Sequence, residues 1–208
     1  MWLPILIIAV VSYFLGNLNG AIFMSRLLEN DDVRNHGSGN AGLTNFLRSY
    51  GGWKTLLVIV MDVGKSVAAC LLGRLLLQDQ GYGLEGAMLA AVAVSLGHDF
   101  PALLGFRVGK GILCGFTVAW MLDWRIALIL LGIFAVVFAL TRYVSLSSVL
   151  AAAGFCVAFC VLHWDRPWVV ASGVFLGVLA IVMHHANIVR LCKGTENKFY
   201  IHKKEKKS

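Results

Sequence analysis

Residues 55–77 read TLLVIVMDVGKSVAACLLGRLLL, an apolar run of 23 residues with few interruptions. A bilayer core needs about 20 apolar residues in a helix, so this run is long enough to cross one. Its two central charged side chains, Asp62 and Lys65, are three positions apart and share a helix face. Because charges are costly in lipid, we expect these two to form an ion pair that supports a nearby site.

Similar apolar runs recur along the whole chain, which is 59% hydrophobic over 208 residues. Only helices and closed barrels satisfy backbone polar groups in lipid, and these continuous runs lack the alternation of barrel strands. The sequence therefore predicts an all-α polytopic membrane protein, with residues 1–208 forming one domain. The seven predicted transmembrane helices are about 2–24, 55–77, 86–97, 112–122, 126–140, 149–162 and 168–184.

The polar segments between these runs carry a strong charge asymmetry. One set holds 14 of the 18 lysines and arginines and comprises residues 25–54, 98–111, 141–148, 184–198 and the basic tail 199–208. The positive-inside rule then places the N-terminus outside and the C-terminus in the cytoplasm. The net charge of +7 is accordingly attributed to topology, and no nucleic-acid partner is predicted. All glycine-rich polar segments face one side, which predicts a single composite site at the cytoplasmic face of the membrane.

The first of these segments contains HGSGNAGLTNFLR, residues 36–48. Its glycines allow close backbone approach, its amides and hydroxyls can donate hydrogen bonds, and it contains no carboxylate. These features are typical of a site for a phosphate or a phosphate ester, and the simpler alternative is a flexible loop. The candidate residues are Gly37, Ser38, Gly39, Asn40, Thr44, Asn45 and Arg48.

The second segment ends in GFRVGKG, residues 105–111, in which Gly109 and Gly111 flank Lys110. Such a turn can wrap an oxyanion while the ammonium neutralises its charge. It is not a P-loop, because Leu104 occupies the place of the required glycine and no Ser or Thr follows the lysine. The alternative is a basic turn that contacts anionic lipid headgroups.

The third segment begins with His184 and Asn187, which would share a face if the last helix continues. Histidine can donate a hydrogen bond or carry a proton there. The histidines have no neighbouring carboxylate and the five cysteines lack metal spacing, so neither a metal nor another cofactor is predicted. Near residues 142–148, Ser145 and Ser148 are candidates for the same site, and we expect at least one hydroxyl there to cap the next helix.

Two devices common in acyl transfer are missing from the chain. No histidine is followed by Asp at the fifth position, and no Gly-x-Ser-x-Gly elbow occurs. Even so, HGSGN-x-G-x-TN-x-LR, GH-x-FP…GF…GKG and H-x-x-NI-x-RL-x-KGTE-x-K, in this order over nearly the whole chain, resemble the motifs of the bacterial acyl-phosphate:glycerol-3-phosphate acyltransferases, the PlsY family. The chain departs from the family pattern chiefly at Val108 and at residues 112–114.

The resemblance implies an enzyme of the bacterial cytoplasmic (inner) membrane that needs no cofactor. It would transfer a fatty acyl group from acyl-phosphate to the 1-hydroxyl of glycerol 3-phosphate, giving lysophosphatidic acid and phosphate, the first acylation of phospholipid synthesis. An enzyme that produces acyl-phosphate is a candidate partner. The alternatives are an acyltransferase of the same fold with another phosphorylated acceptor, or a small transporter of lysolipids or phosphate esters. The transporter is disfavoured because the polar segments gather on one face.

The resemblance also assigns roles by position. Residues that would act on the reacting groups or their phosphates are Ser38, Arg48, Lys110, His184 and Asn187. Residues that would bind substrate are Gly37, Gly39, Asn40, Thr44, Asn45, Gly109, Gly111, Ser145, Ser148 and Lys193. Structural support would come from Asp62, Lys65 and Glu196.

Overall fold

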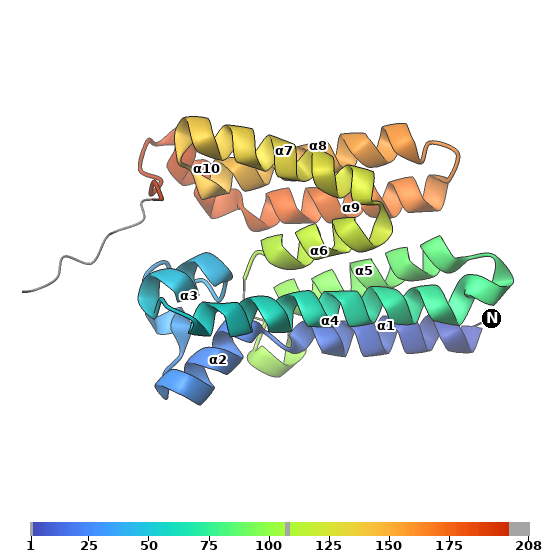
Figure 1. Ribbon diagram of the computed structural model, residues 1–208, viewed down its shortest axis with the longest axis horizontal. Coiled ribbons are helices and arrows are strands. Elements are labelled where there is room, and N and C mark those ends of the chain that lie inside the picture. The colour runs from blue at the N-terminus through green and yellow to red at the C-terminus, as the bar shows by residue number, and fades with distance from the viewer. Residues whose placement is uncertain (1, 107–108, 200–208) are drawn as a thin grey trace, which may run out of the picture.

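A computed structural model describes residues 2–106 and 109–199, and these residues form helices and connecting turns without a β-strand (Figure 1). Val108 and all but the first residue of the basic tail, both singled out in the sequence, lie outside the described residues. The α-helices are α1 (Trp2–Asn17), α2 (Gly20–Glu29), α3 (Leu43–Ser49), α4 (Lys54–Leu77), α5 (Gly83–Asp99), α6 (Ile112–Leu122), α7 (Trp124–Thr141), α8 (Val144–Leu162), α9 (Pro167–Met183) and α10 (His185–Cys192). Short 3₁₀ turns cover Val33–Asn35, Gln78–Gln80 and Ala102–Leu104.

The helices follow the predicted apolar runs. Four of them, α4, α5, α7 and α8, are long and apolar enough to cross a membrane, and the bent pairs α1–α2 and α9–α10 raise the number to six in the described chain. The remaining predicted run, the fourth along the chain, is α6, which has only 11 residues and is too short to cross a bilayer core alone. The structure thus confirms an all-helical fold, with four to six candidate spans.

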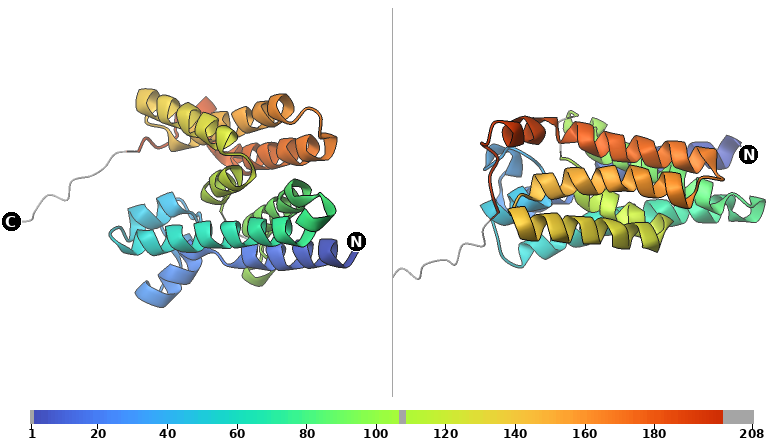
Figure 2. Two further views of the ribbon diagram at one scale, coloured as in Figure 1. Left: turned by 45° about the vertical axis from the view of Figure 1, so that its right-hand side comes forward. Right: turned by 90° about the horizontal axis from the view of Figure 1, so that it is seen from above.

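The helices form two layers (Figure 1). One layer contains α1, α4 and α5, the other contains α7, α8 and α9, and α6 lies between them in Figure 1 and in the left view of Figure 2. The short helices α2, α3 and α10 gather at one end of the molecule, opposite the N-terminus. The first and third polar segments therefore meet at the same end, as the charge pattern predicts.

Paired glycines bring the helices of the first layer into near contact. A Cβ atom on Gly73 of α4 would lie 2.1 Å from the carbonyl oxygen of Gly86 on α5. A Cβ atom on Gly97 of α5 would lie 2.0 Å from the carbonyl oxygen of Tyr13 on α1. Such small residues let helix backbones approach closely in membranes, where packing rather than hydrophobicity drives association.

The first predicted helix is interrupted in the structure. It breaks at residues 18–19, and α2 continues at an angle of 40° to α1. Asn19 begins α2: its side-chain oxygen accepts a hydrogen bond from the Ile22 amide at 2.9 Å, and its Nδ2 donates to the Ala41 carbonyl at 3.1 Å. The polar patch at the end of the apolar run thus marks a break that the first loop packs against.

Two expectations about helix ends were wrong. The last helix does not continue through His184, because α9 and α10 meet there at 55°. The serines near residue 145 belong to α8 itself, and none of them caps it. Ser147 and Ser148 donate instead to the carbonyls of Tyr143 and Val144, at 2.8 and 2.9 Å, inside the first turns of the helix.

The glycine contact between α4 and α5 yields a stability prediction. Gly73→Ala should lower the free energy of unfolding by about 1–3 kcal/mol, because the added methyl group must push two backbones apart. Gly64→Ala on the same helix is the matched control, since nothing lies within 4 Å of a Cβ there. It should leave stability unchanged or raise it by up to about 1 kcal/mol. Thermal unfolding in detergent measures both, and equal Tm values for the two variants would contradict the packing argument.

Candidate active site

One cavity of about 470 Å³ collects the predicted polar segments. It lies between the two layers, and residues of all three motifs and of the serine segment line it. The sequence-predicted residues in its lining are Ser38, Asn40, Thr44, Asn45, Arg48, Asp62, Lys110, Gly111, Ser145, Ser148, His184, Asn187 and Glu196. Side chains more than 140 positions apart in the sequence therefore share one chamber.

The same cavity has an apolar part. It is lined by side chains of α7, α8 and α9, including Leu130, Phe134, Ala152, Phe155 and Leu176. The chamber is thus polar and cationic where the motif segments meet and apolar where it runs between helices. A ligand with a charged head and a hydrocarbon chain matches both parts.

Several predicted residues lie outside the lining. Gly37 and Gly39 have φ of +56° and +70°, which few other residues tolerate, and they shape the first loop. A Cβ on Gly37 would also lie 2.3 Å from the side-chain oxygen of Asn45. Buried Gly109 packs its backbone against the first loop, with a Cβ there only 3.0 Å from the Ala41 carbonyl oxygen. Lys193 is exposed after α10 and does not line the cavity.

Asn45 organises the first loop from within. Its side-chain oxygen accepts a hydrogen bond from the Ser38 amide at 3.0 Å. Its Nδ2 donates to the carbonyls of Val33 and His36, at 3.1 and 3.0 Å. These bonds engage both the oxygen and the nitrogen of the Asn45 amide. Asn45 therefore holds Ser38 in place at the cavity wall.

Glu196 ties three elements together at the polar end. Its Oε1 accepts hydrogen bonds from the Ser145 hydroxyl and the Asn187 amide, both at 2.7 Å, and its Oε2 accepts from Arg190 Nε at 2.7 Å. Burial alone would raise the pKa of Glu196, but these three donors outweigh it and hold the pKa below its usual value. The carboxylate therefore stays ionised and fixes Asn187 toward the cavity.

Lys110 reaches across to the third segment and donates to the side-chain oxygen of Asn187. Burial and the neighbouring Arg190 guanidinium lower the pKa of Lys110, and Glu196 partly opposes the shift. Arg48 also lines the cavity, and among the described residues it has no ion-pair partner. With Asp62 already paired to Lys65, the cations Arg48, Lys110 and Arg190 outnumber the carboxylates Glu196 and Asp99 at this end by one, and a bound anion would relieve that imbalance.

His184 is held in one tautomer by the bend between α9 and α10. Its Nδ1 lies 2.7 Å from the Ala180 carbonyl, which can only accept, so Nδ1 carries the proton. In the neutral ring, Nε2 is then left as an acceptor. The imidazole is buried and lines the cavity. The break in the helix, rather than a continuous face, is what presents His184 and Asn187 together.

The predicted ion pair of Asp62 and Lys65 is present, fully buried, with 2.8 Å between Asp62 Oδ1 and Lys65 Nζ. The ammonium also donates to the Leu18 carbonyl at 2.7 Å and the Gly16 carbonyl at 3.3 Å. Asp62 Oδ1 accepts from the Gly20 amide at 3.2 Å. The pair therefore satisfies backbone groups that the break between α1 and α2 leaves without helical partners.

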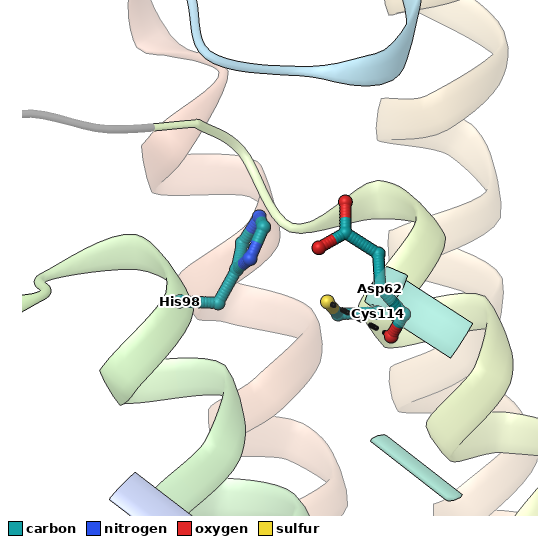
Figure 3. A group of neighbouring side chains, drawn as sticks. All are labelled: Asp62, His98 and Cys114. Carbon is teal, nitrogen blue, oxygen red and sulfur yellow. Dashed lines mark hydrogen bonds between the residues drawn. The ribbon is translucent and has the colours of Figure 1, made fainter. Parts of the chain in front are cut away.

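Asp62, His98 and Cys114 form a group whose possible metal-ligand atoms all lie within 4.8 Å of one another, a spacing compatible with a metal ion (Figure 3). The Lys65 ammonium contacts two members of this group, because it lies 2.7 Å from His98 Nδ1 and forms an ion pair with Asp62. The Cys114 thiol points instead to the Asp62 carbonyl oxygen at 3.8 Å. A lysine thus supplies the positive charge that a metal would bring.

Three titratable residues of the cavity lining were not among the sequence candidates. His98 and Asp99 are both buried at the end of α5, and Arg190 lies on α10 beside Glu196. His98 and Arg190 belong to the quoted motifs, so their residue types offered a signal. Asp99 offered no such signal, because a single acidic residue at the end of an apolar run is ordinary at the boundary between membrane and water.

The chain is similar to characterised proteins over almost its whole length. The family model described as glycerol-3-phosphate acyltransferase matches residues 6–194. The chain belongs to the glycerol-3-phosphate acyltransferase family. Among curated relatives of that name, the protein of Thermoanaerobacter sp. (strain X514) is 40% identical, over 91% of this chain and 93% of its own. The relative from Clostridioides difficile (strain 630) is 37% identical, over 93% and 94%.

The fold of the family is also found in solved structures. The crystal structure of PlsY, an integral membrane glycerol 3-phosphate acyltransferase, in its glycerol 3-phosphate form, superposes with a TM-score of 0.84 at 29% identity, over 94% of this chain and 96% of that chain. Its lysophosphatidic acid form gives a TM-score of 0.78 at 28% identity, over 94% and 95%. The resemblance seen in the motifs is confirmed, and the chain has the integral-membrane fold of this family.

The buried ion pair yields a second stability prediction. Lys65→Met should cost about 3–5 kcal/mol, because it leaves the Asp62 carboxylate buried without a counter-charge. Adding Asp62→Asn should recover part of that loss. The exposed pair of Glu85 and Arg166, at 3.4 Å, is the control, and Arg166→Met should cost less than about 1 kcal/mol. Denaturation in detergent measures these three variants and Asp62→Asn alone, and additive losses in the double variant would refute coupling.

Proposed function

We propose that this protein transfers a fatty acyl group from acyl-phosphate to the 1-hydroxyl of glycerol 3-phosphate, giving lysophosphatidic acid and phosphate, the first acylation of phospholipid synthesis. The observation that carries the proposal is the single cavity, which joins a cationic polar end to an apolar part. Family membership supports the acceptor and the product. The donor is the one that the motif resemblance implies. An acyl-phosphate is already activated, which fits a chain without the Gly-x-Ser-x-Gly elbow or the His-x-x-x-x-Asp pair.

The polar end would bind phosphate. Ser38, Asn40 and Thr44 would donate to phosphate oxygens from the first loop, and Arg48 and Lys110 would neutralise their charge. Both substrates carry phosphate groups, so the excess of positive charge around Lys110 and Arg190 matches them. Such preorganised donors stabilise charge without rearrangement during the reaction. Ser145 and Ser148 would close the same wall from α8.

In the reaction, the 1-hydroxyl oxygen attacks the acyl carbonyl carbon, an ester bond forms, and the mixed-anhydride bond to phosphate breaks. A phosphate oxygen of a substrate would accept the hydroxyl proton, since the chain has no His-x-x-x-x-Asp pair to act as base. Asn187, fixed by Glu196, and His184, held in one tautomer, would orient the reacting oxygens. The enzyme then contributes mainly alignment and charge stabilisation, which suits a donor with a good leaving group.

The acyl chain would lie in the apolar part of the cavity between α7, α8 and α9.

We further propose that the protein resides in the bacterial cytoplasmic membrane, with its N-terminus outside and the site at the cytoplasmic face. Seven segments would then insert, counting each bent helix pair once and α6 as a short, protein-enclosed segment. The charge bias of the loops supports this orientation. Accessibility of single cysteines introduced at Gln78 and Glu29 to an impermeant thiol reagent, in spheroplasts of a variant without the native cysteines, tests it.

The activity is tested with purified protein, acyl-phosphate and glycerol 3-phosphate, by release of phosphate and appearance of lysophosphatidic acid. Lys110→Ala and His184→Ala should each lower kcat/KM by about 10²–10³-fold, because each removes a charged or polar group from the reacting centre. Lys54→Ala is the matched control, since Lys54 pairs with Glu29 outside the cavity. Full activity in the first two variants would refute the site, and no product from the unmodified enzyme would refute the reaction.

A further inference from the structure

Asp99 is a buried acid without a role in the proposed chemistry. It is the last residue of α5, is 4% exposed, and lines the cavity. Its Oδ1 is buried and has no hydrogen-bond partner, and no side-chain hydrogen bond to Asp99 occurs within residues 2–106 and 109–199. Buried carboxylates are nearly always hydrogen-bonded, since an unpaired one is costly. The cavity therefore contains an acceptor that lacks its donor.

The described neighbours of Asp99 do not supply that donor. A Cβ on Gly111 would lie 2.9 Å from Asp99 Oδ1, which places the carboxylate beside the second motif, next in sequence to Lys110. The Lys65 ammonium is already engaged by Asp62, His98 and two backbone carbonyls. Lys110 donates to Asn187 on the opposite wall. The described residues thus leave this carboxylate without a donor, and a group that enters the cavity can supply one.

A carboxylate repels a phosphate group and accepts hydrogen bonds from hydroxyl groups. The proposed acceptor, glycerol 3-phosphate, brings two hydroxyls, and its non-reacting 2-hydroxyl needs a partner once it is enclosed. We propose that Asp99 accepts a hydrogen bond from this 2-hydroxyl, and so positions the acceptor and selects phosphorylated polyols over simple hydroxyalkyl phosphates. The inference rests on the proposed function and assigns the part of that site which binds the glycerol backbone.

The 2-hydroxyl is a better partner than the reacting 1-hydroxyl. A base for the 1-hydroxyl must pass its proton onward, and no hydrogen bond among the described residues connects Asp99 to another side chain. His98, its neighbour in sequence, uses Nδ1 for the Lys65 ammonium rather than for the carboxylate. A fixed acceptor without a relay is suited to holding a hydroxyl and not to carrying a proton away. Asp99 is accordingly a positioning residue.

The test compares two acceptors, glycerol 3-phosphate and 3-hydroxypropyl phosphate, which has the reacting hydroxyl and the phosphate but no 2-hydroxyl. The unmodified enzyme should prefer glycerol 3-phosphate by about 10–100-fold in kcat/KM, the range of a hydrogen bond to a charged group. Asp99→Ala should abolish that preference, mainly by raising KM for glycerol 3-phosphate. Asp99→Asn keeps one acceptor oxygen and should retain a part of it. Asp79→Asn, an exposed acid on the turn after α4, should keep the full preference.

The outcomes separate the inference from the function on which it rests. If the unmodified enzyme makes no lysophosphatidic acid, the proposed function fails. If it does so without preferring glycerol 3-phosphate, or if Asp99→Ala and Asp99→Asn lower activity on both acceptors equally, then Asp99 does not hold the 2-hydroxyl. Thermal unfolding of each variant shows that it is folded. Should Asp99→Ala fail to fold, the preference of the unmodified enzyme and of Asp99→Asn decides.

Discussion

The buried ion pair of Asp62 and Lys65 is the constraint on which the structure depends. It lies in the middle of an apolar helix and makes hydrogen bonds to its neighbours. The Lys65 ammonium donates to carbonyls at the end of α1, and the Asp62 carboxylate accepts from the first amide of α2. A helix can break inside a membrane protein only where the freed backbone groups find partners. This pair provides them, and the break in turn directs the first loop across the end of the bundle.

Close approach of the helices depends on a second set of residues. Glycines on α1, α4 and α5 bring three backbones together, and His98 at the end of α5 then reaches the Lys65 ammonium. The first layer is thus a rigid, densely packed base. The second layer, α7 to α9, meets it around α6 and leaves the cavity between.

At the polar end, the functional side chains are held by residues that do not act on a substrate. Asn45 fixes the Ser38 backbone, and Glu196 fixes Asn187 and Arg190. Each uses its own hydrogen-bonding groups fully and leaves its neighbour directed into the cavity. Asp99 is the exception, because it is buried and unpaired. That contrast is the basis of the proposal that Asp99 binds a ligand.

The sequence by itself determined the helical membrane fold, because apolar runs of sufficient length allow few other structures in lipid. It also determined the family and most of the polar residues of the cavity, since glycines, amides and cations at fixed spacing carry their chemistry locally. Only the tertiary structure decided that Gly37, Gly39 and Gly109 shape loops, that the last helix bends at His184, and that Asp99 lines the cavity. These facts depend on contacts between segments distant in sequence, and such contacts cannot be predicted from the local sequence around each residue.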